Sequence, residues 1–137
     1  MLLLDGRSLQ IADVMAVADG VLAVGLAPEA RARMQVTRDV VDRAVARAEP
    51  VYGINTGFGK LSEVTIAGDQ LAALQRNLVR SHAAGVGDPL PEREVRAMML
   101  LRANVLATAF AGARPIVVES LLAMLNAGVW PVVPEQG

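Results

Sequence analysis

Residues 91–128 read PEREVRAMMLLRANVLATAFAGARPIVVESLLAMLNAG, and this stretch carries the clearest helical signal in the chain. Pro91 and Pro115 each stand where the first turn of a helix tolerates proline. Gly112 and Gly128 follow the two apolar runs and are typical of helix ends. Apolar residues of the first run recur at helical spacing and are expected to form its buried stripe: Met98, Leu101, Val105 and Ala109. The stretch therefore predicts two consecutive helices.

Three further helices are expected upstream of this pair. Their expected boundaries, each marked by a capping residue, a proline or a glycine, are Ser8 to Gly20, Pro28 to Pro50 and Asp69 to His82. The apolar stripe of the second comprises Ala30, Met34, Val41, Ala44, Val45 and Ala48. Residues 21–26 and 129–137 are expected to be extended. The chain is thus predicted to be mainly α, with a short extended element near its start.

The composition fits one domain that has more apolar residues than it needs. The 137 residues are 53% hydrophobic and carry a net charge of -1. This balance gives no field that attracts phosphate backbones or anionic lipids, so neither nucleic acid nor a membrane is an expected partner. The longest uncharged stretch, 120–134, is too short for a membrane span. Without cysteine or a secretory signal, the cytoplasm is the expected compartment, and the surplus apolar residues are expected to pack against further polypeptide.

Residues 50–69 break the helical pattern and contain a glycine-rich loop, GINTGFG, directly after Tyr52. Glycines such as Gly59 let backbone N–H groups approach a ligand closely, and a tyrosine beside such a loop suits a proton carrier. His82, the only histidine, stands at an expected helix end. Both features also have structural interpretations, as a loose turn and as a buried core histidine. One histidine and no cysteine leave no expected metal site.

Several ordered motifs together resemble a known enzyme family. YGINTGFGKL, LQRNLVRSHAAGVG, RANVLA with GARP, and VVPEQG follow one another as they do in the N-terminal part of histidine ammonia-lyase. The resemblance covers nearly the whole chain and is weakest before Pro28. It implies that residues 1–137 are the N-terminal portion of a longer, helix-rich lyase of the aromatic amino acid lyase family.

The resemblance also implies a prosthetic group that these residues do not contain. The family makes 4-methylideneimidazole-5-one (MIO) by cyclising an Ala-Ser-Gly triad of its own backbone, and this triad is expected a few residues after VPEQG. MIO would thus be formed by residues beyond Gly137, so the 137-residue chain is expected to be inactive alone. The intact enzyme is expected to be a homotetramer that converts L-histidine to trans-urocanate and ammonia without metal or nucleotide.

Three positions match functional residues of the family. Tyr52 matches the loop tyrosine that assists proton transfer, and tyrosinate suits this task where positive dipoles or desolvation favour it. His82 matches the histidine of the SHAAG motif, which helps to select the substrate side chain and favours histidine over phenylalanine. Gly59 matches the loop glycine whose backbone lies against the substrate. Tyr52 and His82 are therefore expected to converge on one amino acid.

Two alternatives stay open, and the chain departs from the family pattern in places. A tyrosine ammonia-lyase or an aminomutase can also carry histidine at the place of His82, and a non-enzymatic helical module would use its apolar stripes only for association. Glycine and serine are expected where Ala109 and Ala111 stand, and both alanines are interpreted as helix-packing sites. Asn104 and Arg114 match polar positions for which a structural role is expected.

Overall fold

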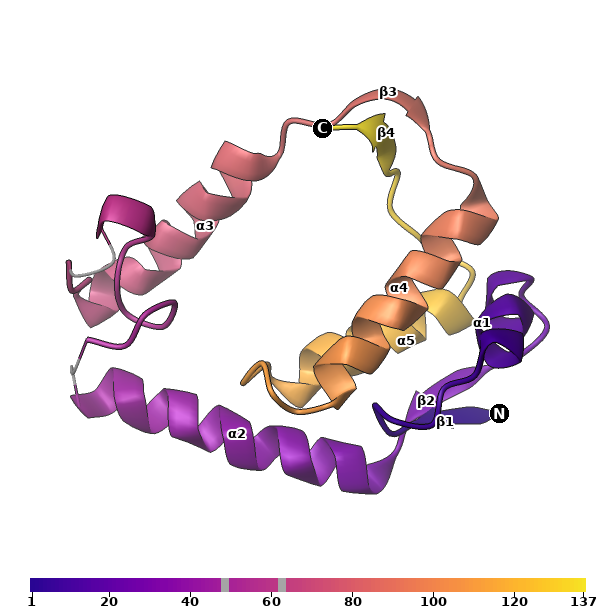
Figure 1. Ribbon diagram of the computed structural model, residues 1–137, viewed down its shortest axis with the longest axis horizontal. Coiled ribbons are helices and arrows are strands. Elements are labelled where there is room, and N and C mark those ends of the chain that lie inside the picture. Colours follow the sequence, from indigo (N-terminus) through magenta and orange to yellow (C-terminus); the bar gives the residue numbers. More distant parts are fainter. Residues whose placement is uncertain (48–49, 62–63) are drawn as a thin grey trace.

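The computed structural model describes residues 1–47, 50–61 and 64–137. Its helices are α1 (Ile11–Ala18), α2 (Pro28–Arg47), α3 (Leu71–His82), α4 (Glu92–Ala107) and α5 (Pro115–Asn126). Helices α4 and α5 lie side by side, and α1 packs against α4 (Figure 1). Helix α2 runs along one edge of this group, whereas α3 stands apart from it and has no buried residue. The predicted mainly α fold is confirmed.

Within residues 1–47, 50–61 and 64–137, four short strands form two separate pairs. Strand β1 (Leu2–Leu4) pairs in parallel with β2 (Val24–Leu26), and β3 (Val86–Pro89) pairs antiparallel with β4 (Pro134–Gln136). The side chain of Asn126 accepts a hydrogen bond from the Val24 N–H (2.9 Å) and donates one to the Val24 carbonyl (2.7 Å). This double contact fastens β2 to the end of α5.

The hydrophobic core lies where α1, α4, α5 and the β1–β2 pair meet. Its fully buried large side chains include Leu4, Val17, Val24, Val95, Leu100 and Val118. Arg96 is also buried there, and its Nε and Nη2 donate to the carbonyls of Ala18 (3.0 Å) and Val17 (2.9 Å). Because the last carbonyls of a helix lack partners within it, Arg96 satisfies the end of α1 and is itself neutralised in part by that negative end.

The predicted stripe of α4 is wrong at three of its four positions, and only its last member, Ala109, is buried. Met98, Leu101 and Val105 are each about half exposed, and the buried face consists of Val95, Met99, Leu100, Ala103, Leu106 and Ala107. Both faces of the helix are apolar, so helical spacing alone fits either of them. The contacts with α1 and α5 determine which face is buried.

The end of α4 also differs from the prediction. The helix stops at Ala107, and Ala109 has a positive φ of 71°. A left-handed residue just after a helix is the usual place of glycine, because a Cβ there is strained. Ala109 therefore lies just beyond the helix and terminates it, and its side chain is buried in the core as a packing residue. Ala111 is an exposed residue of the following turn and not a packing site. The left-handed backbone at position 109 explains why the family pattern has glycine there.

Two predicted N-caps are each displaced by one or two residues. Gln10, not Ser8, precedes α1, and the Asp13 carboxylate accepts a hydrogen bond from the Gln10 N–H at 3.0 Å. The Ser8 N–H instead binds the Asp5 carboxylate at 2.9 Å. Asp69 lies in a 3-10 turn, η2 (Gly68–Gln70), so that Gln70 precedes α3.

The predicted stripe of α2 is buried only at its beginning. Ala30 and Met34 are buried, whereas Val41, Ala44 and Val45 are half-buried. Ala48, the last member of that stripe, lies outside the described residues, as do two residues at 62–63 of the irregular segment. The far half of α2 therefore keeps part of its apolar face uncovered.

Candidate functional site

The glycine-rich loop follows α2 and is held by buried polar side chains. Asn55 and Thr56 are 3% and 1% exposed, and Asn55 Oδ1 accepts a hydrogen bond from the Val51 N–H at 2.8 Å. The Asn55 carbonyl accepts from the Ile66 N–H at 2.8 Å, which ties the loop to the segment before α3. The loop thus has polar anchors, although the sequence predicts a loose segment with few apolar ones.

Tyr52 stands on the outside of this loop. Its side chain is 64% exposed, and its ring meets the edge of Phe58 with 6.1 Å between ring centroids and 73° between planes. A cavity of about 400 Å³ beside it is also lined by Val40 and Phe110. The phenol is therefore positioned by an aromatic contact and remains accessible to a substrate.

Gly59 opens the 3-10 turn η1 (Gly59–Leu61) and has a φ of +57°. A Cβ built on it would meet no atom within 4 Å. The left-handed backbone requires glycine there, and the open space beside it allows a ligand to approach the backbone. The contact of this backbone with a substrate stays a prediction.

His82 is the last residue of α3, and its side chain is exposed. The interpretation as a buried core histidine is therefore wrong. Its Nδ1 lies 2.9 Å from the Leu78 carbonyl oxygen and 3.0 Å from Ser81 Oγ. The ring is thus attached to its own helix through one nitrogen and presents the other outward.

Tyr52 and His82 lie at opposite ends of α3 in this chain. Gly53 and Ile54, next to Tyr52, line a cavity with Leu71 and other residues of the first turns of α3. Helix α3 has 12 residues and is therefore about 18 Å long. The convergence of the two side chains on one amino acid stays a prediction about the assembled protein.

The β3–β4 ribbon brings the last residues of the chain next to the residues that follow His82 (Figure 1). Val86 pairs with Gln136. A Cβ built on Gly137 would lie 2.6 Å from Gly85 Cα and 2.9 Å from the Ala84 oxygen. The backbone of Gly137 therefore lies against the backbone of Ala84 and Gly85, which are two and three residues after His82. The sequence contains no strong signal for this pairing, because β3 includes both a glycine and a proline.

A family comparison matches almost all of this chain. The model of the aromatic amino acid lyases ("Aromatic amino acid lyase") matches residues 9–137. The chain belongs to the aromatic amino acid lyase family. Among its relatives are the histidine ammonia-lyases of Anaeromyxobacter dehalogenans (57% identical, 99% of this chain, 27% of the relative) and Stigmatella aurantiaca (52%, 98% and 26%).

Solved structures of this lyase family share the fold. Tyrosine aminomutase from Streptomyces globisporus is similar with a TM-score of 0.93 and 36% identity, over 99% of this chain and 26% of that one. Histidine ammonia-lyase from Trypanosoma cruzi is similar with a TM-score of 0.91 and 42% identity, over 99% and 27%. The chain spans about a quarter of the length of the relatives that it matches.

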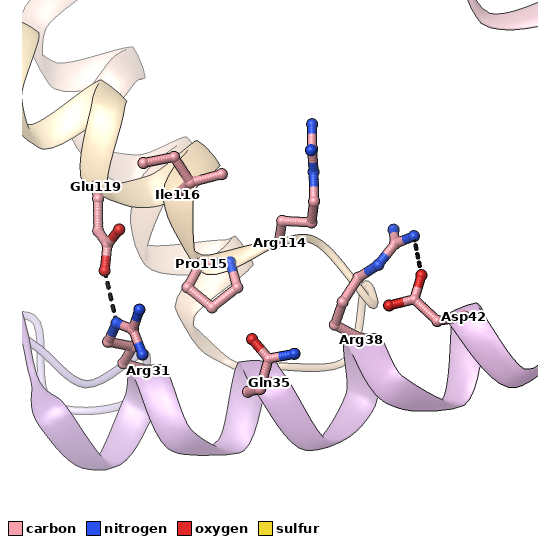
Figure 2. Close-up of a pocket in the computed structure, with 8 residues that line it drawn as sticks. All are labelled: Arg31, Gln35, Arg38, Asp42, Arg114, Pro115, Ile116 and Glu119. Atoms are coloured by element: carbon pink, nitrogen blue, oxygen red, sulfur yellow. Dashed lines mark hydrogen bonds and ion pairs between the residues drawn. The ribbon is translucent and has the colours of Figure 1, made fainter. Parts of the chain in front are cut away.

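A cavity of about 530 Å³ lies between α2 and the start of α5 (Figure 2), and Tyr52, Gly59 and His82 are not among its lining residues. Arg31 Nε donates to the Glu119 carboxylate at 2.8 Å, and Arg38 pairs with Asp42. Hydrogen bonding from Arg38 lowers the pKa of the Asp42 carboxyl below its usual value. Both carboxylates that line the cavity are thus already paired. Arg114 lines the same cavity. This cavity was not predicted from the sequence.

Three further observations concern a buried polar atom, metal ligands and membrane spans. The side-chain oxygen of Asn104 is buried without a hydrogen-bond partner among the described residues. Within the same residues, no three histidine, aspartate or glutamate side chains gather as a metal site would require. None of the helices in the described part of the chain combines the length and apolar character of a membrane span.

Proposed function

We propose that this chain is the N-terminal part of a histidine ammonia-lyase, which converts L-histidine to trans-urocanate and ammonia. The observation that carries the proposal is the 57% identity with a histidine ammonia-lyase over 99% of the chain. Among solved structures, the identity is 42% with a histidine ammonia-lyase and 36% with tyrosine aminomutase. The exposed imidazole of His82 at the end of α3 supports a substrate whose side chain forms hydrogen bonds. The enzyme is proposed to act in the cytoplasm.

The elimination requires the loss of a weakly acidic β proton and the departure of the amino group. The β C–H bond breaks and its electron pair forms the double bond between Cα and Cβ. The C–N bond breaks and its electron pair leaves on the nitrogen, which departs as ammonia. Tyr52 would accept the β proton on its phenolic oxygen, which its exposed position leaves open to a substrate. His82 would hold the substrate imidazole, and the backbone at Gly59 would lie against the substrate.

The prosthetic group of the family fits the end of the β3–β4 ribbon. MIO, when formed, supplies an electrophile that makes the amino group a better leaving group. A chain that continues from Gly137 leaves the ribbon beside Ala84 and Gly85, where the close backbone approach leaves no room for a Cβ at position 137. The expected Ala-Ser-Gly triad would thus begin close in space to Ala84 and Gly85, the residues that follow His82.

Exposed apolar side chains support packing against further polypeptide, which we propose includes the other subunits of a homotetramer. Phe110 is 91% exposed, and Met98, Leu101 and Val105 are about half exposed along one face of α4. Apolar surface of this extent is typical of a chain that packs against further polypeptide. We assign it to the remainder of the enzyme and to the neighbouring subunits.

The test is a steady-state assay of the full-length protein and of the 137-residue chain. The full-length protein should release urocanate from L-histidine, and the 137-residue chain alone should release none. Release of coumarate from L-tyrosine, or of β-tyrosine, in place of urocanate would show that the tyrosine-specific alternative is correct. Measurable turnover by the 137-residue chain would contradict the assignment of MIO to residues beyond Gly137.

His82→Phe in the full-length protein should change the substrate preference. The ratio of kcat/KM for L-phenylalanine to that for L-histidine is expected to rise by about 100-fold or more. The imidazole of the substrate L-histidine loses its hydrogen-bond partner, whereas the phenyl ring of L-phenylalanine gains an apolar contact. The two amino acids are compared as competing substrates. Val79→Phe, which adds the same ring at an exposed position of α3, is the control and should leave the ratio unchanged. An unchanged ratio in His82→Phe would remove His82 from the substrate site.

Gly85→Ala tests the role of the ribbon. A Cβ at Gly85 would lie 2.5 Å from Cγ of Pro134, so β4 must move away from β3. A displacement of about 1 Å at a reacting group costs up to about 100-fold in rate, and we expect kcat of the full-length protein to fall by about 10- to 100-fold. Gly68→Ala, where a Cβ meets nothing within 4 Å, is the control. Equal kcat values for the two variants would show that the ribbon does not position the reacting groups.

A further inference from the structure

The imidazole of His82 is held by a compact set of contacts at the end of α3. Its Nδ1 lies 2.9 Å from the carbonyl oxygen of Leu78 and 3.0 Å from Ser81 Oγ. Ser81 Oγ in turn lies 2.8 Å from the same carbonyl oxygen and donates to it. All three distances are within hydrogen-bond range. One backbone carbonyl therefore faces both side chains.

The chemistry of these atoms fixes where the imidazole proton lies. A carbonyl oxygen only accepts hydrogen bonds, so an unprotonated Nδ1 at 2.9 Å would place two lone pairs against each other. Nδ1 must therefore carry the hydrogen and donate it to Leu78. The Ser81 hydroxyl donates its own hydrogen to the same carbonyl. Its oxygen can therefore also accept a hydrogen bond from Nδ1–H, which is then shared between two acceptors.

We infer that the Leu78 carbonyl and the Ser81 hydroxyl hold neutral His82 in its Nδ1–H tautomer, so that Nε2 is presented at the end of α3 as a hydrogen-bond acceptor. The position suits this tautomer, because carbonyls in the last turn of a helix attract N–H donors. Ser81 is thus a positioning residue that acts through His82. In the described part of the chain, no hydrogen-bond partner is assigned to Nε2.

The tautomer determines what kind of side chain His82 can bind, and this part of the inference rests on the proposed function. A neutral Nε2 accepts a hydrogen bond and does not donate one. The substrate must therefore bring the hydrogen, as the N–H of an imidazole does. A substrate whose ring presents only a lone pair to His82 would be rejected, since both groups would then be acceptors.

The tautomer is measured directly by nitrogen-15 NMR of the chain. Because His82 is its only histidine, labelled histidine gives one pair of imidazole nitrogen signals. Once the buffer pH is raised until the nitrogen signals no longer move, Nδ1 should appear as the protonated nitrogen and Nε2 as the unprotonated one. The opposite assignment would overturn the inference, and this measurement requires neither a variant nor turnover.

Ser81→Ala and Ser81→Thr separate the hydroxyl from the helix. Ser81→Ala should shift the tautomer balance towards that of free imidazole, in which the Nε2–H form predominates, whereas Ser81→Thr keeps a hydroxyl and should retain the Nδ1–H form. A purely structural role for Ser81 would not move these signals while circular dichroism shows intact helices. Identical tautomer populations in wild type and Ser81→Ala would overturn the role of Ser81.

The acceptor role is tested in the full-length protein with two amide variants. A glutamine at position 82 extends its amide oxygen to about the place of Nε2, whereas asparagine is too short to do so. We expect His82→Asn to raise KM for L-histidine about tenfold more than His82→Gln does. Equal KM values in the two variants would overturn the acceptor role. Absence of urocanate formation by the wild type would instead overturn the proposed function and leave the NMR result standing.

Discussion

Replacing Tyr52 with phenylalanine in the full-length protein is expected to lower kcat for L-histidine by about 10²- to 10⁴-fold, with a much smaller change in KM. A positioned proton acceptor contributes a factor of this size to the rate, and phenylalanine has no group that accepts the β proton. The measurement is steady-state release of urocanate at saturating L-histidine. An equal reduction of binding and turnover is not expected, because the phenol acts on the proton and His82 binds the side chain.

The variant is informative because the ring environment can be preserved. Tyr52 is 64% exposed, and its contact with Phe58 is between ring edges and faces, which phenylalanine also provides. Phe58→Leu is the matched control, since it removes the ring contact and keeps the phenol. We expect it to lower kcat by less than about tenfold. A Tyr52→Phe enzyme within about threefold of wild type would contradict the catalytic role of Tyr52, whereas a full-length wild type without any turnover would favour the interpretation as a non-enzymatic association module.

Gly6→Ala is expected to be strongly destabilising, with a loss of about 2–5 kcal/mol in the free energy of unfolding. About 1–2 kcal/mol of this loss comes from the left-handed backbone, since Gly6 has a φ of +79°. The remainder, about 1–3 kcal/mol, comes from overpacking. A Cβ at Gly6 would lie 2.5 Å from the backbone nitrogen of Thr108, just after α4.

The surroundings of Gly6 leave the backbone little room to relax. The Asp5 carboxylate accepts hydrogen bonds from the N–H groups of Ser8 (2.9 Å) and Arg7 (2.8 Å), and these bonds lower the pKa of Asp5 to about 2. Arg33 donates to the Asp5 carbonyl at 2.7 Å. The turn is thus attached to α2 on one side and presses against the end of α4 on the other.

The control is Gly53→Ala, which has nearly the same backbone strain without the steric contact. Gly53 has a φ of +78°, and a Cβ there would meet nothing within 4 Å. We expect its loss to be only about 1–2 kcal/mol. Urea unfolding followed by circular dichroism gives both values, with the dependence on urea concentration unchanged. Equal losses in the two variants would show that Gly6 does not limit the packing of the N-terminal turn on α4.

Helices were predictable because their ends carry local signals. Pro28 and Pro115 begin α2 and α5 as predicted, and α3 ends at His82. The burial of α4 was not predictable, because apolar residues occur around the helix. Leu101 on one face and Leu100 on the next satisfy the same spacing, and only contact with α1 and α5 distinguishes them.

The strands were less predictable than the helices for a different physical reason. Strand β1 has three residues and β3 contains Gly87 and Pro89, so neither shows an alternation that identifies a strand. Each forms through pairing with a segment distant in sequence, β2 or β4. Ala109 illustrates the same limit, since its left-handed backbone depends on how the chain turns from α4 into α5.

The candidate residues were found by motif, and their surroundings were not. Tyr52, Gly59 and His82 are all exposed, and the polar anchors of the loop, Asn55 and Thr56, were not singled out from the sequence. Their burial follows from contacts with the segment before α3, which no local pattern records. The Ser81 contact with His82 likewise depends on the rotamer of a helix-end side chain.

The most direct test of whether Tyr52 and His82 serve one substrate is a crystal structure of the full-length assembly with urocanate bound. We predict that the Tyr52 hydroxyl and His82 Nε2 contact the same urocanate molecule, with His82 at its imidazole and Tyr52 beside the carbon that carried the lost proton. A structure in which the two side chains contact different molecules, or face separate hydrophobic interiors, would contradict the proposed lyase site.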